Sequence, residues 1–297
     1  MPGAMIDRFV RRQSWTDPTA EVLQKGVGGI YRPLGPLGRL LRNLLHGTYL
    51  LGHPLHPALT DVPLGAWTVG VVADYVAHFN TAIPESAGDI ALAVGVVVAI
   101  GVVLSGYTDF YDTFGLERRW AVLHGLFMTT VFVLECVSLA LRWWAGEGAH
   151  PLAVALSTIG WVLVIVGAYF GGHVVFGTGT MVNRAAFIDG PDDWADAGPA
   201  SDVPATGMHL VEAGGMKVVL ARLDGQVCAL SEICSHAGGP LHEGTFENGV
   251  VTCPWHASRF RFRDGHVVGG PATFDQVRLQ VRDVDGRLQV KLTEPLH

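Results

Sequence analysis

The sequence has few charged residues, and this shortage narrows the class of protein. Asp, Glu, Lys and Arg make up only 16% of the 297 residues, and the mean hydropathy is +0.33. That balance is too apolar for an ordinary water-soluble chain of this length. The net charge of −7 is modest and indicates no basic surface, so we expect no nucleic-acid partner.

Cysteine is also scarce. The chain contains only Cys136, Cys228, Cys234 and Cys253. Cys136 falls in an apolar helical segment and Cys228 in a predicted strand, so we interpret both as small core residues. No pair remains that is typical of a disulfide framework, which favours a reducing compartment. The first thirty residues mix charges with prolines and lack an apolar run, so we expect no secretory signal peptide.

Long apolar runs are confined to one part of the chain. We predict four membrane-spanning helices near residues 59–80, 89–108, 120–143 and 152–175. Each is long enough, because about 20 residues cross a bilayer. Arg118 and Arg119 lie between the second and third helices, on the side of the basic N-terminal arm. By the positive-inside rule, both chain ends face the cytoplasm in a multi-pass protein of the inner (plasma) membrane.

The basic arm contains a short amphipathic segment at residues 37–45, with leucines on one helical face and arginines on the other. Two interpretations remain open. The segment forms a helix on the membrane surface near anionic lipid headgroups, or it packs on the helical bundle.

Three histidines, His56, His124 and His173, are predicted at one depth of the bundle, near the cytoplasmic ends of their helices. Polar side chains are costly in lipid and therefore need a partner or a function. Two interpretations remain open. The histidines bind a b-type haem or a metal ion, or they hydrogen-bond to backbone or to Asp61 and Asp109 and stabilise packing.

Two short segments of the C-terminal region each hold one cysteine and one histidine. They read Cys-Ser-His at 234–236 and, after a gap of sixteen residues, Cys-Pro-Trp-His at 253–256. Two thiolates and two imidazoles can bind a two-iron cluster, with the cysteines on one iron and the histidines on the other. A structural zinc site also uses these residue types, but it favours Cys-x-x-Cys and His-x₃₋₅-His pairs.

Around these segments the apolar pattern changes to a period of two. Asp-Gly pairs at 224, 264 and 285 separate alternating runs, which is typical of hairpins in a small antiparallel β sandwich or barrel. We therefore predict an α+β multidomain chain, with a four-helix transmembrane bundle followed by an all-β sandwich. Its parts are a basic arm (1–57), the transmembrane domain (58–176), an acidic flexible linker (177–205) and the β domain (206–297).

The ligand spacing and the β pattern together resemble the Rieske [2Fe-2S] proteins over the whole C-terminal domain. This resemblance implies a [2Fe-2S] cluster with Cys234 and Cys253 on one iron. His236 and His256 would then bind the other iron, and Ser258 would hydrogen-bond to a cluster sulfur.

Departures from the family pattern are informative. Rieske proteins of cytochrome bc complexes carry a further cysteine in each ligand loop, where this chain has Gly239 and Trp255. It therefore resembles the ferredoxin-type Rieske proteins that serve oxygenases. A tyrosine of high-potential members is replaced by Phe260. Fewer hydrogen bonds to sulfur imply a potential in the lower half of the roughly −150 to +300 mV Rieske span.

The predicted membrane domain carries a resemblance of its own. The sequence His-Pro-Leu-His-Pro at 53–57 precedes the spans, and Gly-Tyr-Thr-Asp at 106–109 follows the second. Over roughly residues 50–176, this pattern resembles a bacterial membrane-domain family of unknown function (family 2231). The resemblance implies a fold but no activity.

Three functions remain open. The first is a membrane-anchored carrier that passes single electrons from a membrane, quinone or haem donor to a cytoplasmic acceptor. The second is a ferredoxin component that feeds a separate oxygenase. The chain after residue 256 is expected to be too short for the mononuclear iron domain of an oxygenase itself. The third is a redox-gated transporter or sensor. We expect a component of an oxidoreductase system, with the lipid bilayer and a redox protein or quinone as partners.

Overall fold

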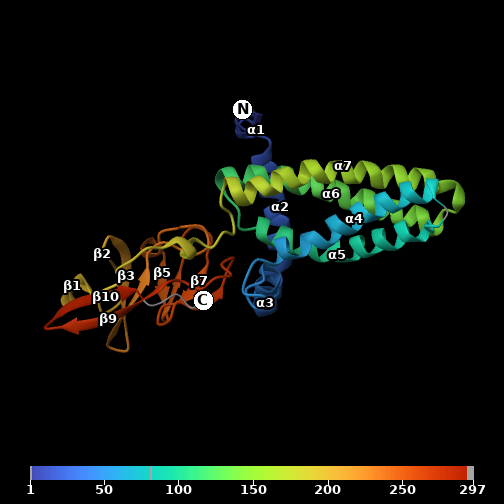
Figure 1. The fold of residues 1–297 in the computed structure, drawn as a ribbon. Helices are drawn as coiled ribbons and strands as arrows, with labels where there is room; N and C mark the ends of the chain where they lie inside the picture. The colour runs from blue at the N-terminus through green and yellow to red at the C-terminus, as the bar shows by residue number, and fades with distance from the viewer. Residues whose placement is uncertain (1, 81, 293–297) are drawn as a thin grey trace. The chain divides into compact units, whose positions relative to one another are not determined.

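The computed structural model describes residues 2–80 and 82–292, and it divides into two compact units. The helical unit holds the residues up to Gly38 and those from Pro54 to Thr178. The β unit holds Arg39–His53 and the described residues from Gly179 onward (Figure 1).

Four long helices form the core of the helical unit. They are α4 (Leu55–Phe79), α5 (Ser86–Phe110), α6 (Gly115–Trp144) and α7 (His150–Gly172), which continues into the π-helical η3 (His173–Gly177). They run side by side as a bundle, in which α4 packs on α5 and α6 packs on α7 (Figure 1). These helices correspond to the four predicted from the apolar runs.

Three helices of the described chain are long and apolar enough to cross a membrane, namely Ser86–Phe110, Gly115–Trp144 and His150–Gly177. Helix α4 has sufficient length but is less apolar, because Asp61, Pro63 and Asp74 lie within it. The apolar character of three predicted spans is thus confirmed, whereas that of α4 is weaker than predicted.

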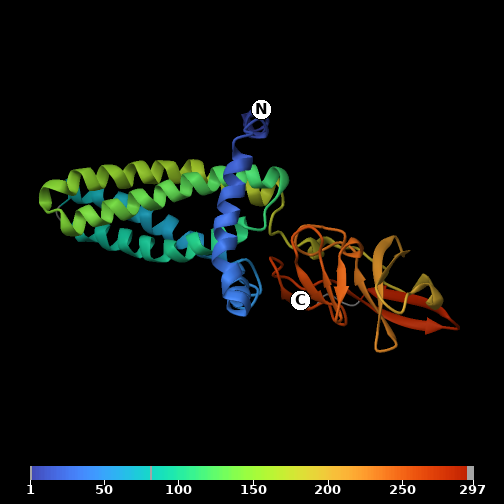
Figure 2. The same ribbon diagram turned by 180° about the vertical axis from the view of Figure 1, so that it is seen from behind.

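The N-terminal arm contains two helices that the sequence pattern did not predict, α1 (Pro2–Arg11) and α2 (Thr16–Tyr31). Helix α2 lies across one end of the bundle (Figure 2). Its Ala20 is buried in a cluster with Phe110, and the Gln24 side chain donates to the carbonyl oxygens of Phe110 (3.1 Å) and Thr113 (2.8 Å). The few buried apolar residues of these helices are interspersed with charged residues, so the sequence shows no long apolar pattern from which the helices could be predicted.

The two helix pairs repeat one arrangement. On α4 and α5, His56 faces Gly106 and Trp67 faces Gly95; on α6 and α7, His124 faces Gly171 and Glu135 faces Gly160. On each of the four helices the two positions are eleven residues apart. A Cβ atom on any of these glycines would lie 2.4–2.7 Å from the facing side chain, which is too close for any larger residue. Glycine therefore allows the same close packing in both pairs.

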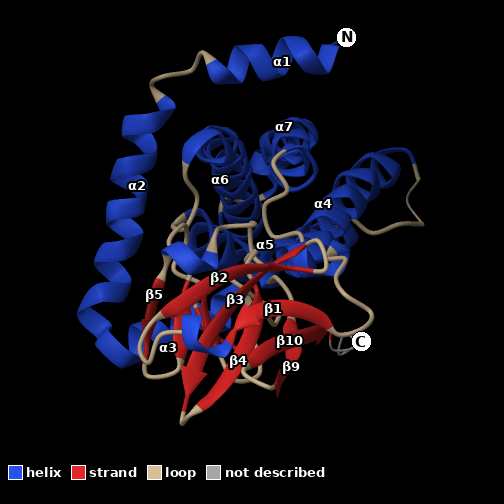
Figure 3. Ribbon diagram, turned by 90° about the vertical axis from the view of Figure 1, so that its left-hand side faces the viewer, coloured by secondary structure: helices blue, strands red, loops and turns tan. Residues whose placement is uncertain are grey.

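The β unit is built from two antiparallel sheets. Its strands, red in Figure 3, are β1 (Ala195–Pro199), β2 (Met208–Ala213), β3 (Met216–Leu223), β4 (Gln226–Ser231), β5 (Thr245–Glu247), β6 (Val250–Thr252), β7 (Arg259–Arg261), β8 (Val267–Gly269), β9 (Arg278–Val284) and β10 (Arg287–Leu292). The larger sheet has the order β1-β10-β9-β4-β3-β2 and the smaller one the order β5-β6-β7-β8.

Apolar residues cover both faces of the larger sheet. Along β3, Val219 belongs to a core cluster shared with Phe260 of the smaller sheet, whereas Val218 and Leu220 belong to a second cluster on the other face. The hairpin predicted at Asp224 is confirmed, because β3 pairs with β4 through this residue, which has a left-handed φ of +49°. The all-β character of the C-terminal region is therefore confirmed.

The segment predicted as a flexible linker, residues 177–205, contains part of the sheet. Strand β1 pairs with β10, and Asp196 accepts a hydrogen bond from Arg287 (3.1 Å). Ala197 and Val203 are buried in the second cluster. The ordered β unit begins before residue 206, because β1, a strand of mostly small residues, is held by backbone pairing.

The amphipathic arm segment forms α3 (Gly35–His46), and residues 39–53 belong to the β unit. The Thr48 hydroxyl donates to the carbonyl oxygen of Ala272 (3.0 Å), and the Tyr49 hydroxyl to that of Val268 (3.2 Å). The segment that follows α3 is therefore held by a loop of the β unit, a contact that neither interpretation of residues 37–45 included. These contacts could not be predicted, because hydrogen bonds from single hydroxyl groups to a loop more than 200 residues away produce no periodic pattern in the sequence.

Candidate iron–sulfur centre

Two loops of the β unit carry the four predicted ligands, and their backbones make equivalent hydrogen bonds. In the loop after β4, the N–H of Cys234 donates to the carbonyl of Gly239 (2.9 Å), and the N–H of Gly238 donates to the carbonyl of Cys234 (2.9 Å). The loop between β6 and β7 repeats both bonds around Cys253, at 2.8 and 3.1 Å. Each loop therefore presents its cysteine from the same kind of tight turn.

The turn residue differs between the loops. Gly238 has a φ of +81°, and the equivalent Ala257 has a φ of +59°. Glycine adopts this left-handed conformation readily, whereas for a residue with a Cβ atom the conformation costs about 1–2 kcal/mol of conformational energy. The second ligand loop thus holds Ala257 in a strained conformation, which its surrounding hydrogen bonds maintain.

The two cysteines lie against each other in the core, with only 1% of Cys234 and 2% of Cys253 exposed. The Cys234 thiol donates a hydrogen bond to Cys253, which lowers the pKa of Cys253 to about 6 despite its burial. The same contact, together with burial, raises the pKa of Cys234 well above its usual range. Backbone N–H groups also point at both sulfurs, those of Trp255 and His256 at Cys253. Such groups stabilise negative charge on sulfur.

The two histidines form a second pair. The rings of His236 and His256 are 4.8 Å apart between centroids, at an angle of 83°, and both residues are buried. The donor set is therefore divided into two sulfurs and two imidazoles, with like ligands together. This division fits a [2Fe-2S] cluster in which each iron takes one kind of ligand.

The two loops touch at Gly239. A Cβ atom there would lie 2.8 Å from the sulfur of Cys253 and 3.1 Å from the Trp255 ring. Only glycine fits without displacing a predicted ligand. Gly239 and Trp255 are also the two positions at which the resemblance placed the cysteines of bc-type proteins, and the structure brings them into contact.

A third loop, Gly269-Gly270-Pro271, covers the second ligand loop. Gly270 has a φ of +84°, and a Cβ atom on it would lie 2.4 Å from the carbonyl oxygen of Ala257. The N–H of Ala272 donates to the hydroxyl of Ser258 (3.2 Å), which is fully buried. Accepting this bond leaves the hydroxyl hydrogen of Ser258 able to donate to a neighbouring group.

One residue that fixes the first ligand loop was missed by sequence reasoning. The Gln276 side chain accepts from the N–H of Ser235 (2.8 Å) and donates to the carbonyls of Ser231 and Ile233 (both 2.7 Å). A single glutamine before a strand carries no motif, so its role depends on the fold. His242 in the same loop is half-buried, and its Nδ1 lies 2.7 Å from a carboxylate oxygen of Glu232.

The three membrane histidines are only partly brought together. The rings of His56 and His124 are 6.1 Å apart between centroids, whereas His173 stacks on Trp120 at 3.6 Å. The Nδ1 atom of His56 lies 3.0 Å from the carbonyl oxygen of Val102. The equivalent distance from His124 to the carbonyl of Gly167 is 2.9 Å. These partners are backbone groups, one of the two kinds predicted.

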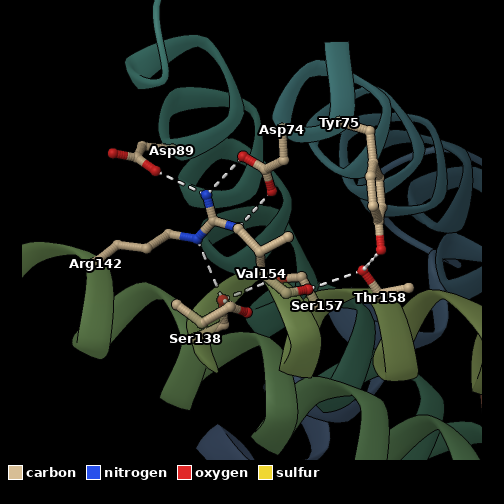
Figure 4. A network of polar contacts seen from close by, with 9 residues as sticks. Asp74, Tyr75, Asp89, Ser138, Arg142, Val154, Ser157 and Thr158 are labelled. Atoms are coloured by element: carbon tan, nitrogen blue, oxygen red, sulfur yellow. Dashed lines mark hydrogen bonds and ion pairs between the residues drawn. The ribbon is translucent and has the colours of Figure 1, made fainter. Parts of the chain in front are cut away.

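A buried charge network in the bundle was not predicted (Figure 4). The Arg142 guanidinium donates to both carboxylate oxygens of Asp74 (2.9 and 2.5 Å) and to Asp89 (2.8 Å). Only 1% of the Arg142 and Asp74 side chains is exposed. The sequence gives no sign of this network, because Asp74 and Asp89 lie on other helices than Arg142.

Comparisons with known proteins agree with both resemblances. A family model described as the Rieske [2Fe-2S] domain matches residues 193–281. A second model, described as a predicted membrane protein (DUF2231), matches residues 52–184.

Individual relatives cover about a third of this chain. The ferredoxin component of the naphthalene 1,2-dioxygenase/salicylate 5-hydroxylase systems of Ralstonia sp is 26% identical over 100 residues, which are 34% of this chain and 96% of that protein. The cytochrome b6-f complex iron-sulfur subunit of Chlorobaculum tepidum is 30% identical over 95 residues, which are 32% of this chain and 51% of that subunit. Among solved structures, the ferredoxin of carbazole 1,9a-dioxygenase from Nocardioides aromaticivorans IC177 is 22% identical, with a TM-score of 0.32, over 34% of this chain and 98% of the ferredoxin.

Proposed function

We propose that this chain, which carries a Rieske [2Fe-2S] domain and a predicted membrane-protein (DUF2231) domain, is a membrane-anchored carrier of single electrons. The observation that carries the proposal is the division of the donor set into a buried cysteine pair and a histidine pair, held by two equivalent loops. When bound, a [2Fe-2S] cluster supplies one-electron redox chemistry.

The ligand loops have defined tasks in this proposal. Cys234 and Cys253 hold one iron, and His236 and His256 hold the other. Backbone N–H groups of the two loops donate to the sulfurs, and burial of all four residues excludes water. The Ser258 hydroxyl adds one donor to the cluster region, whereas Phe260 adds none, so the potential should lie in the lower half of the Rieske range.

Membrane anchoring is supported by the helical unit. We propose that α4 crosses the membrane with the three apolar helices, and that both chain ends and the Rieske domain are cytoplasmic, in the plasma membrane. Arg118 and Arg119 lie beside Asp17 of α2, so this positive charge is at the bundle end that carries the arm. Arg142 is buried in the bundle, so it does not count as a loop charge at the opposite end.

A second candidate function is that of a ferredoxin supplying a separate oxygenase. The Ralstonia relative is named as such a component and is matched over 96% of its length. Rieske proteins of cytochrome bc complexes carry two disulfide-forming cysteines at the positions of Gly239 and Trp255. The replacement of both cysteines in this chain also favours a ferredoxin. In either case the electron donor is a membrane quinone or a redox protein, and the acceptor is a cytoplasmic protein.

Purification of the full-length chain from membranes tests the cluster. We expect two iron and two sulfide ions per chain, a rhombic EPR signal after reduction, and a midpoint in the lower half of the roughly −150 to +300 mV span. One zinc ion per chain without an EPR signal would contradict the proposal. A midpoint near the top of the span would contradict the hydrogen-bond argument alone.

Orientation needs a separate measurement. A cytoplasm-active reporter fused after the β unit should be active, and the same reporter inserted in the loop between α4 and α5 should be inactive. The reverse pattern would place the Rieske domain on the other side of the membrane.

A further inference from the structure

The two histidines that meet inside the helical bundle are held in the same way. Since a backbone carbonyl can only accept, the Nδ1 atoms of His56 and His124 must both carry the hydrogen that bonds Val102 and Gly167. In a neutral ring the other nitrogen, Nε2, then has a free lone pair. A ring N–H fixed by a carbonyl is the usual support of a metal-binding histidine.

The two rings come from opposite corners of the bundle. Helix α4 packs against α5 and α7, and so does α6, which makes α4 and α6 diagonal neighbours. His56 on α4 and His124 on α6 therefore meet across the interior between the two helix pairs. Each bonds a carbonyl of its own pair, on α5 or α7, so its Nε2 lies on the side of the ring away from that carbonyl.

The separation of the rings has a chemical meaning. With metal–nitrogen bonds of about 2 Å, two imidazoles on opposite sides of one metal ion have ring centres roughly 6 Å apart. The observed centroid separation is 6.1 Å, with the ring planes at 81°. The pair thus has the spacing of two axial ligands to a single metal.

The glycines opposite the rings are part of the same arrangement. Gly106 lies one helical turn after Val102, and a Cβ atom on it would be 2.7 Å from the Cε1 of His56. Gly171 stands in the same relation to Gly167 and to the Cε1 of His124, again at 2.7 Å. In both helix pairs, a backbone carbonyl and the glycine one turn after it thus contact the histidine ring, although the sequences of the pairs differ. Close packing alone would not require a histidine in both pairs.

We infer that His56 and His124 are the two axial ligands of a b-type haem bound between the helix pairs. A porphyrin supplies the remaining four nitrogen ligands, so two protein ligands complete a six-coordinate iron. His173, which stacks on Trp120, is not a ligand. This site is additional to the proposed iron–sulfur function and does not depend on it.

Titration of the purified full-length chain with haemin tests the inference. We expect a Soret band that saturates at one haem per chain and a six-coordinate low-spin spectrum in both oxidation states. H56A and H124A should each weaken haem binding at least roughly tenfold. H173A should leave the spectrum unchanged, and circular dichroism with thermal unfolding in detergent reports whether the helical unit of each variant has folded.

Two neighbouring glycines provide a matched pair of variants that keep both histidines. In G171A the new methyl group would collide with the His124 ring and should weaken haem binding by roughly tenfold. In G172A the Cβ atom has no neighbour within 4 Å, so haem binding should be unchanged. Both changes replace glycine by the better helix former alanine, so a difference between them reports on the contact with the His124 ring.

Three results would overturn the inference. The first is the lack of a saturable Soret band in a chain whose helical unit is folded, as judged by circular dichroism. The second is a low-spin haem spectrum that survives in H56A and H124A. The third is a stoichiometric zinc or copper ion, found by elemental analysis, that is lost in these variants while haem does not bind. Loss of the iron–sulfur signal alone would contradict the proposed function and would not affect the inference of a haem site.

Discussion

The β unit and the helical unit stabilise their buried polar groups in different ways. In the β unit the ligand cysteines are oriented by backbone hydrogen bonds within turns of five or six residues. In the helical unit, Arg142 and Asp74 are 68 residues apart in sequence, and His56 and Val102 are 46 residues apart. The comparison shows that a site formed by local turns can be recognised in the sequence as a motif, whereas a site formed between helices cannot.

The energetic consequences also differ. The backbone polar groups of a turn are hydrogen-bonded to one another. A ligand loop therefore loses little folding stability when one of its side chains changes. A desolvated ion pair inside the bundle is different, because removing one partner leaves the other charge buried. Changes in the β unit should therefore affect the cluster, and changes in the bundle should affect folding.

The largest expected effect separates cluster loss from unfolding. C253S should abolish the iron–sulfur EPR signal, because the hydroxyl of serine is a poor ligand for this iron, while the helical unit stays folded in detergent. The control is C228S, which changes a half-buried cysteine of β4 and should retain the signal. Unfolding of the whole chain in C253S would break the distinction between the two units.

The second effect concerns the bundle. R142L leaves the Asp74 carboxylate buried without its cation and should lower the free energy of unfolding by about 3–5 kcal/mol. The double variant D74L/R142L should recover most of that loss. R118L removes a more exposed partner of Asp17, 3.6 Å away, and should cost less than about 1 kcal/mol. Equal losses in R142L and R118L, measured by thermal unfolding in detergent, would refute this account of the network.

A smaller effect sharpens the description of the β unit, because it changes the potential and not the fold. S258A should lower the midpoint potential by about 60 mV, and F260Y should raise it by a similar amount, if one hydrogen bond to sulfur is lost or gained. Redox titration followed by EPR measures both shifts. Shifts of the same sign in the two variants would contradict the proposed donors.

The smallest effect tests the strained turn. A257G should stabilise the second ligand loop by about 0.5–1 kcal/mol, because glycine removes the left-handed strain but loses more entropy on folding. G238A should change the first loop in the opposite direction. The temperature at which the cluster signal disappears compares the two variants, and a lower temperature for A257G would show that the turn is not strained.

Much of the fold followed from local patterns. The apolar runs located α4 to α7, and Asp-Gly pairs located the hairpins of β3–β4 and β9–β10. Strand β1 was missed because its Ala-Asp-Ala-Gly-Pro sequence has no strand pattern and is held by pairing with β10, and α2 was missed because its buried face is short. Gln276 and Arg142 were missed for a common reason, since each acts on residues that only the folded chain brings near.

The sequence alone predicted the ligands of the candidate cluster, because two cysteines and two histidines in short loops with this spacing are typical of a [2Fe-2S] site. It also determined that the chain has an apolar helical part and a β part. Only the tertiary structure decided which histidines of the bundle meet, that their Nδ1 atoms donate to backbone carbonyls, and that Arg142 lies between two carboxylates. The reason is physical: helix-to-helix contacts depend on the packing of side chains across the bundle, and residue spacing within one helix does not specify its neighbour.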